Sequence, residues 1–240
     1  MNNVTHSMAS EPNPNPIDLI QSIETLLHRR RSIRGFTQQL VPDEVLRNIF
    51  ELGQLSPSNC NVQPWRTFVA SGAVKNRLRD AFTAQVQNQI PGNPDYPYND
   101  RFEEPYRGHQ VRCAVALFKE MGIERDDRAG RGRANLRNYE FFDAPHVAFI
   151  GMHHQFRETV AIDIGIYLQT IMLAMTAYGI GCCAQGSLRN YPDIVRREFG
   201  ISRDISILVG LSFGYEDTGI DANRVRMTRA QLEENVTFKG

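Results

Sequence analysis

The sequence predicts an α+β fold in which a long central helix lies against a β-sheet. Two apolar segments, VAFIGM at residues 147–152 and ISILVGLSFGY at residues 205–215, have the length and the β-branched and aromatic content of buried strands. Residues 160–181 between them form a long and mostly apolar segment that suits a buried helix. Helices with interspersed strands are typical of an α+β sandwich.

The composition is that of a globular protein with a sizeable core. The chain has 240 residues, of which 41% are apolar and 22% charged, and this balance argues against wholesale disorder. Lys+Arg and Asp+Glu both number 27, so zero net charge argues against nucleic acid as the main partner. We expect residues 1–16, rich in Asn, Pro and Ser, to form a flexible tail without a secretory signal, and residues 17–240 to fold as one domain.

The four cysteines indicate free thiols rather than a disulfide or zinc scaffold. Cys60, Cys113, Cys182 and Cys183 match no zinc-binding spacing, and four cysteines are too few to staple a chain of this length. Free and mostly buried thiols fit a reducing compartment. We therefore expect a cytoplasmic protein.

The N-terminal part of the chain predicts two amphipathic helices, a strand and a third helix. Apolar residues recur at helical spacing over residues 17–28, and Pro42 opens a second helix that closes near Gly53. WRTFVAS, residues 65–71, has the pattern of a short strand, and a helix is expected over residues 73–89. The expected buried stripe of the second helix is Val45, Leu46, Ile49, Phe50 and Leu52.

Residues 91–106 form a polar and aromatic segment that suits a long surface loop. The segment is too polar for a core element, yet its four aromatic side chains are too many for a plain linker. Loops of this kind often shape binding sites. The aromatic residues are Tyr96, Tyr98, Phe102 and Tyr106.

The segments that follow predict further solvated and buried elements. A helix is expected over residues 108–120, and the charged run at 124–138 suits a solvated helix and loop, because it carries no interleaved aromatic side chains for stacking nucleic-acid bases. Asp163 and Gln169 interrupt the apolar segment 160–181, so we expect a helix buried on most sides in a soluble protein and no membrane span.

The remaining elements are a turn, a helix and the last strand. GIGCCAQGS, residues 179–187, is expected to be a polar turn, and residues 192–199 a helix before the strand at 205–215. His153 and His154 invite a metal assignment. However, adjacent residues of a strand point to opposite faces and no third ligand is in view, so no metal site is predicted.

Two arginine clusters near opposite ends of the chain could bind a phosphate group. Guanidinium groups bind phosphate bidentately, and the hydroxyl of Ser32 could complete its oxygen shell. Two unrelated solvated patches would look the same in the sequence. The clusters are Arg29, Arg30, Arg31 and Arg34, and Arg224, Arg226 and Arg229.

Motifs for other chemistries are missing from the sequence. It contains no P-loop, no Rossmann glycine pattern and no nucleophile elbow, and no Ser/His/Asp arrangement or carboxylate pair stands out. If the protein is an enzyme, its chemistry is therefore expected to belong to a cofactor rather than to a catalytic residue.

Three motifs in order resemble the FMN-dependent nitroreductase family. RRRSIRGF at 29–36 precedes an amphipathic helix, SPSNCNVQPW at 56–65 follows it, and NRVRMTRAQLEENV at 223–236 closes the pattern. The resemblance covers residues 26–238, and residues 91–144 are similar to those of nitrobenzoate-type reductases. It implies an α+β sandwich with a mixed, mainly antiparallel sheet and a central buried helix, in an intertwined homodimer with FMN at the interface.

The resemblance also implies which residues surround FMN. One chain would hold the phosphate and ribityl end, with a cation at the N1 edge of the flavin, and the partner chain would supply a polar lip. A turn after the central helix would direct a backbone N–H at N5, although glutamate is common where Gln185 stands. The implied residues are Arg30, Arg31, Ser32, Arg226 and Arg229 at the phosphate, Arg34 at N1, Pro57, Ser58, Asn59, Asn61 and Gln63 in the lip, and Cys183, Ala184, Gln185 and Gly186 at the ring.

The implied activity is reduction of nitroaromatic compounds, and also of quinones, in two half-reactions with NADH or NADPH as the donor. Tyr96, Phe102 and Arg107 are expected to contact the substrate, on the composition of their loop. The same scaffold also supports enone reduction, dehalogenation or flavin fragmentation, and a non-catalytic FMN-binding module is the alternative outside enzymes.

Overall fold

The computed structural model describes residues 15–96 and 101–240, so the predicted N-terminal tail lies almost wholly outside the described residues, as does Tyr98. The helices are α1 Pro16–Arg29, α2 Asp43–Gly53, α3 Gly72–Gln87, α4 Tyr106–Glu120, α5 Arg128–Tyr139, α6 Glu158–Ala177, α7 Pro192–Phe199 and α8 Leu232–Asn235. The strands are β1 Arg66–Ser71, β2 His146–His153, β3 Gly181–Gln185 and β4 Ile205–Gly214.

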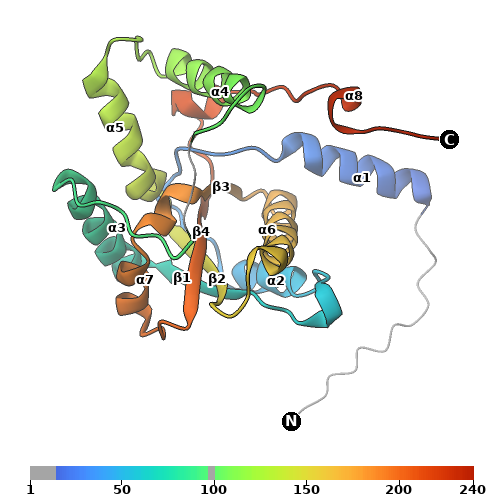
Figure 1. Ribbon diagram of the computed structural model, residues 1–240, viewed down its shortest axis with the longest axis horizontal. Helices are drawn as coiled ribbons and strands as arrows, with labels where there is room; N and C mark the ends of the chain where they lie inside the picture. Colours follow the sequence, from blue (N-terminus) through green and yellow to red (C-terminus); the bar gives the residue numbers. More distant parts are fainter. Residues whose placement is uncertain (1–14, 97–100) are drawn as a thin grey trace.

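The four strands form one sheet in the order β1-β2-β4-β3, and each neighbouring pair is antiparallel. An isolated parallel bridge joins Ser32 to Cys182 at the β3 edge, so the sheet itself is antiparallel throughout its described strands and the expected mixed character is limited to this bridge. Helices α3, α5 and α7 lie on one side of the sheet, and α2 and α6 lie on the other (Figure 1). The predicted α+β sandwich is therefore confirmed.

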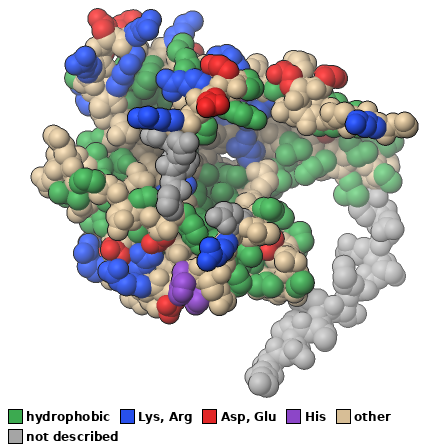
Figure 2. Space-filling view, in the orientation of Figure 1, with side chains coloured by type: hydrophobic (Ala, Val, Ile, Leu, Met, Phe, Trp, Pro, Cys, Tyr) green, Lys and Arg blue, Asp and Glu red, His purple; other side chains and the backbone are tan. Residues whose placement is uncertain are grey.

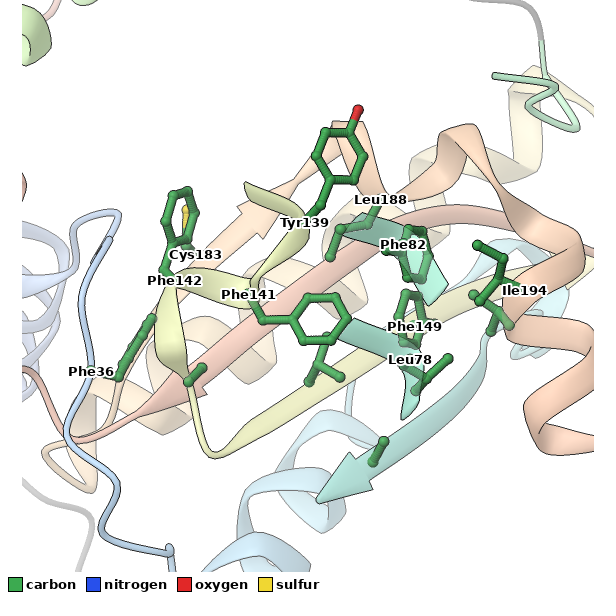
Figure 3. Close-up of a cluster of buried hydrophobic side chains, with 14 of the residues drawn as sticks. Phe36, Leu78, Phe82, Tyr139, Phe141, Phe142, Phe149, Cys183, Leu188 and Ile194 are labelled. Atoms are coloured by element: carbon green, nitrogen blue, oxygen red, sulfur yellow. The ribbon is translucent and has the colours of Figure 1, made fainter. Parts of the chain in front are cut away.

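The core is divided by the sheet into two apolar clusters. Successive residues of β2 alternate between them, with Phe149 in one cluster and Ile150 in the other. In the first cluster, Phe82 of α3 stacks on Phe149 at a centroid distance of 5.8 Å, beside Phe141 (Figure 3). Both faces of β2 are covered, which explains why its sequence is apolar throughout rather than alternating.

Residues 181–185 form strand β3, so the predicted turn over GIGCCAQGS is wrong for this part. Local glycine and polar residues favoured a turn, but β4 offers an apolar partner strand, and Cys182 and Cys183 are buried when β3 pairs with it. Tertiary pairing overrides local preference in such strands. Leu52 is also exposed, because the buried face of α2 runs through Ile49 and Gly53 instead.

Helix α6 occupies the predicted central position, but in a single chain it is buried on one face. Tyr167 and Ile171 point into the core, whereas Ile162 is 64% exposed and Ile166 is exposed as well. By length and composition the stretch Thr159–Ala177 could cross a membrane, with a mean hydropathy of 1.6, but 33% of it is already buried in the protein. The expectation of burial on most sides is not met within one chain.

Helix α1 has the predicted amphipathic pattern, but none of its side chains is buried. It projects from the body of the molecule, and hydrophobic side chains gather along this arm (Figures 1 and 2). A helix of 14 residues is marginal in water without packing, and α1 leaves its apolar face uncovered among the described residues. The exposed apolar residues are Ile17, Leu19, Ile20, Ile23 and Leu27.

His146 joins β2 to the segment before α2. Its Nε2 accepts a hydrogen bond from the Val41 N–H at 3.0 Å, so Nδ1 carries the proton and donates to Ser71 Oγ. The ring also stacks on Phe213 at a centroid distance of 5.3 Å. The only unprotonated ring nitrogen, Nε2, is occupied by the Val41 N–H. His146 therefore cannot take a proton from the Ser71 hydroxyl, and the pair is structural.

We predict that His146 makes the protein less stable in mild acid. Burial lowers the pKa of His146 from 6.5 and outweighs the opposite effect of Asp43, so below about pH 6.5 the unfolded chain binds more protons than the folded one. The free energy of unfolding should therefore fall as the pH drops from about 6.5. Above that pH, the contribution of His146 should not change.

Urea unfolding between about pH 5 and 8 checks this, comparing wild type with His146→Gln, whose amide oxygen can still accept from Val41. The variant should lose part of the acid sensitivity, whereas His154→Gln, at an exposed position, should keep it. Equal pH dependence in wild type and His146→Gln would contradict the assignment.

Candidate functional site

The two arginine clusters predicted from the sequence line one groove of about 970 Å³. Ser32 and its neighbouring arginines, which follow α1, form one wall, and the segment between β4 and α8 forms another. The structure therefore brings together residues nearly 200 positions apart, as two unrelated solvated patches would not. The members of the two clusters that line the groove are Arg30, Arg31, Arg34, Arg226 and Arg229.

Asn223 fastens the two walls to each other. Its side chain is 3% exposed, and its Oδ1 accepts a hydrogen bond from the Arg34 N–H at 2.6 Å. Its Nδ2 donates to the carbonyls of Gly35 and Asp217, both at 2.9 Å. Its own carbonyl accepts from the side chains of Arg31 at 3.1 Å and Arg226 at 2.8 Å. One residue thus holds both arginine clusters in place.

The charge of the groove is mostly unbalanced. Arg31 forms an ion pair with Glu216, which fixes Arg31 against the sheet side of the groove. Among the residues that the structure describes, no carboxylate forms an ion pair with the other four predicted phosphate and flavin arginines. Three of these donate to nearby carbonyls instead. Unpaired guanidinium groups fit a phosphate monoester well.

The edge of β3 lies next to this groove. The Ile33 N–H donates to the Cys182 carbonyl at 3.0 Å, so Cys182 presents its backbone to the free edge of the sheet. Backbone direction alternates along a strand, and therefore Ala184 also faces this edge. Gly181 allows the close approach, because a Cβ there would lie 2.7 Å from Ile33 Cγ1. Ala184 and Gly186 are exposed, as a surface for a flat ring requires.

The side chain of Gln185 supports the fold rather than a ligand. It is buried, its Nε2 donates to the Asn138 carbonyl at 2.8 Å, and its Oε1 accepts from the Ser212 hydroxyl. A glutamate would lack the donor for Asn138, which explains an amide at this position. The backbone role expected for Gln185 and Gly186 does not depend on this side chain.

The adjacent cysteines are buried thiols. Burial raises the pKa of Cys182 to about 12 and also raises the pKa of Cys183. The thiolate is the reactive form, so thiol chemistry is disfavoured at both positions. Both thiols therefore act as packing side chains of the core.

The polar lip at residues 57–63 is an exposed loop with a strained backbone. Cys60, Asn61 and Gln63 have φ angles of 48°, 53° and 48°, in the left-handed region that costs about 1–2 kcal/mol for most residues. The Ser58 hydroxyl accepts from the Gln63 N–H at 2.9 Å and holds this shape. Strain of this kind persists where surrounding contacts fix it, and it clusters at functional sites.

Asp163 of α6 anchors the lip. Its Oδ2 accepts a hydrogen bond from the Asn59 N–H at 3.2 Å, and the side chain is almost fully buried in an otherwise apolar helix. This contact explains the acidic residue that interrupts the apolar run.

Within one chain, the lip and the arginine groove lie far apart. Asp163 holds the lip near the beginning of α6, whereas Thr176, near its end, lines a cavity together with Arg31. Thirteen residues of helix separate these two positions, which corresponds to about 20 Å. Figure 1 shows the same separation, with the segment after α2 at the opposite end of α6 from α1.

The three predicted substrate residues do not gather at the groove. The Tyr96 hydroxyl donates to the Phe156 carbonyl at 2.9 Å, and Phe102 is exposed. Arg107 is exposed and donates to Gln110 of its own helix at 2.8 Å. Aromatic composition indicated a binding loop but could not show which side of it faces the groove.

Helix α4 supplies groove residues of which the sequence analysis named only Tyr106, as an aromatic of the preceding loop. They recur at intervals of three and four residues and so share one helical face, a pattern visible in the sequence once the helix start is known. Arg112 lies beside this face and lines the groove as well. The residues on the face are Tyr106, His109, Cys113 and Leu117.

His153 and His154 differ from the expectation that they diverge. His154 follows the end of β2, so the two rings stack at a centroid distance of 4.6 Å, and Asp204 lies close enough to be a third ligand. However, His153 Nδ1 accepts from the Gln155 N–H at 3.2 Å, and His154 Nδ1 lies 3.2 Å from the Asp204 carbonyl. Both Nδ1 atoms thus already have protein partners, and we assign no metal to this largely exposed group.

The sandwich with an arginine-lined groove beside the free edge of β3 defines the class of protein as an α+β fold with a candidate anion-binding site. The chain belongs to the nitroreductase family, whose model matches residues 27–215.

Individual members of the family support this assignment over nearly the whole chain. Nitroreductase NfnB of Mycolicibacterium smegmatis is 38% identical over 234 residues, covering 97% of this chain and 99% of that protein. The 4-nitrobenzoate reductase of Nocardioides sp. strain LMS-CY is 32% identical, covering 91% and 90%. The solved FMN-dependent NfnB from Mycobacterium smegmatis in complex with NADPH has a TM-score of 0.89 at 38% identity, covering 93% of this chain and 100% of that one.

We predict that removing the Asp163 carboxylate loosens the lip. Asp163→Leu leaves the Asn59 N–H without its acceptor, which weakens the local structure by about 1–3 kcal/mol, whereas Asp163→Asn keeps an acceptor oxygen. Hydrogen exchange of the peptide covering residues 56–65 measures the effect directly. Exchange should be faster in Asp163→Leu than in Asp163→Asn. Wild-type protection in both variants would show that this bond does not hold the lip.

Proposed function

We propose that this protein is an oxidoreductase that uses FMN and a nicotinamide donor, NADPH by the relatives, to reduce nitroaromatic compounds. The observation that carries the proposal is the arginine groove, fastened by Asn223 beside the exposed edge of β3. The relatives named above are nitroreductases, and one of the solved structures holds NADPH. FMN, when bound, would supply the transfer of two electrons from the donor to the nitro compound.

The residues of the groove fit the phosphate of FMN. Arg30, Ser32, Arg226 and Arg229 offer several N–H donors and a hydroxyl, with unbalanced positive charge. Arg31 is held by Glu216, so its part is to position the wall as well as to add charge. A phosphate at this groove would be bound by charge-assisted hydrogen bonds, each worth roughly 1.5–3 kcal/mol.

The ring would lie along the β3 edge. Arg34, whose backbone N–H is fixed by Asn223, would place a cation at the N1 side of the ring, where negative charge develops on reduction. The turn that Gln185 and Gly186 form at the end of β3 would direct a backbone N–H at N5. Cys183 and Ala184 would form the surface beneath the ring, and no side chain of the protein is required as a nucleophile.

We further propose that residues 17–240 act as one FMN-binding domain in an intertwined homodimer. The lip is separated from the groove by about 20 Å along α6, so a second copy is needed to bring Pro57, Ser58, Asn59, Asn61 and Gln63 to the ring. The exposed apolar faces of α1 and α6 are the surfaces that such a partner would cover. Phe238 in the C-terminal arm is also exposed.

Two further features fit this function. All four cysteines are free, which supports a cytoplasmic enzyme. The exposed ring surface leaves room for a small aromatic molecule and the nicotinamide to occupy it in turn, as a reaction in two half-steps requires.

We predict that the purified protein is yellow and that NADPH, added without oxygen, bleaches the flavin band. Adding 4-nitrobenzoate should then restore the band, because the nitro group accepts the electrons. Absorbance near the flavin maximum follows both steps. NADH serves as the second donor, and buffer without a donor serves as the control. Bound flavin that neither NADPH nor NADH reduces would overturn the enzymatic proposal and favour a non-catalytic FMN-binding module.

A further inference from the structure

We propose that Arg112 and His109 of α4 bind an anionic group of the ligand that exchanges over FMN, and not FMN itself. The anionic group is the 2′-phosphate of NADPH or a carboxylate on the nitroaromatic, which share the same recognition chemistry. This inference rests on the proposed function, because it concerns the second ligand of the same site.

The first argument is an excess of positive charge. Six arginines line the groove together with His28 and His109, against one carboxylate, Glu234. Arg31 is balanced by Glu216, and Glu234 is engaged with the Gln231 N–H in the cap of α8. The phosphate of FMN carries at most two negative charges, so it does not balance the arginines that remain.

The second argument is the geometry of the pair. Arg112 Nη2 donates to His109 Nδ1 at 2.8 Å, and because arginine can only donate, Nδ1 is the acceptor. The proton of the neutral ring therefore resides on Nε2. The contact orients the guanidinium and the ring together, and it leaves the other guanidinium N–H groups and the Nε2–H as donors. A phosphate or carboxylate fits such a set of donors.

The third argument is position. Arg112 and His109 belong to α4, which packs against the segment Asp221–Arg224. The predicted phosphate-binding residues instead belong to the segment after α1, at 30–32, and to the segment before α8, at 226–229. The pair is therefore placed on a separate wall of a groove that is large enough for more than one group.

Arg107 offers a matched control on the same helix. It has the same charge, but it is bonded to Gln110 and does not line the groove. Composition alone favoured Arg107 as the substrate residue, so the comparison of Arg107 with Arg112 separates the two interpretations.

The experiment compares Arg112→Gln and Arg107→Gln with wild type, using steady-state turnover and FMN titration. The KM is measured for NADPH against NADH, and for 4-nitrobenzoate against nitrobenzene. We expect Arg112→Gln to raise the KM of one anionic ligand roughly 10- to 100-fold, with its uncharged or less charged counterpart unchanged. A change confined to NADPH identifies the phosphate, and a change confined to 4-nitrobenzoate identifies the carboxylate. Arg112→Lys should recover part of the loss.

Three outcomes would overturn the proposal: unchanged KM ratios in Arg112→Gln, a loss of FMN affinity as its main effect, or an equal effect of Arg107→Gln. Failure of the proposed function itself would look different, because wild type would then oxidise no NADPH in the presence of a nitroaromatic.

Discussion

The hydrogen bonds of Asn223 are the contact on which the candidate site depends. Its side-chain amide accepts a hydrogen bond from the Arg34 N–H and donates to two carbonyls. Its backbone carbonyl accepts hydrogen bonds from the side chains of Arg31 and Arg226. A buried amide satisfied on every side is rigid, and removing it would leave several groups unpaired. The two arginine clusters are thus placed as one unit, and the Ile33–Cys182 bond attaches that unit to the sheet.

Helix α6 sets the distance between the two parts of the candidate site. It separates the anchored lip from the groove by about 20 Å, and it leaves one apolar face exposed beside the exposed arm of α1. The proposed homodimer would account for these features together, because a second copy of the chain would cover the apolar faces and bring its lip to the ring. The strained lip backbone is consistent with a loop whose shape serves a partner surface.

Sequence periodicity predicted most helices and the strands β1, β2 and β4, because their patterns of apolar residues reflect burial. It missed β3, whose strand form depends on pairing with β4, and it could not show that α1 and half of α6 remain uncovered in one chain. The motifs at 29–36 and 223–236 indicated the groove residues, since arginine and serine side chains are suited to binding phosphate. Which residues of α4 line the groove was not predictable, because the face that α4 turns to the groove depends on tertiary packing, and Arg112 rather than Arg107 lies there.

The most direct test of the central claim is complementation between two damaged chains. One chain carries Arg226→Ala and Arg229→Ala, the other carries Ser58→Ala and Asn61→Ala, and FMN bound per dimer is measured by absorbance. A site shared between subunits predicts weak FMN binding by each variant alone, and one tightly bound FMN per mixed dimer, because one of its two sites is then intact. Absence of any recovery in the mixed dimer, or full occupancy in the Ser58/Asn61 variant alone, would contradict the account.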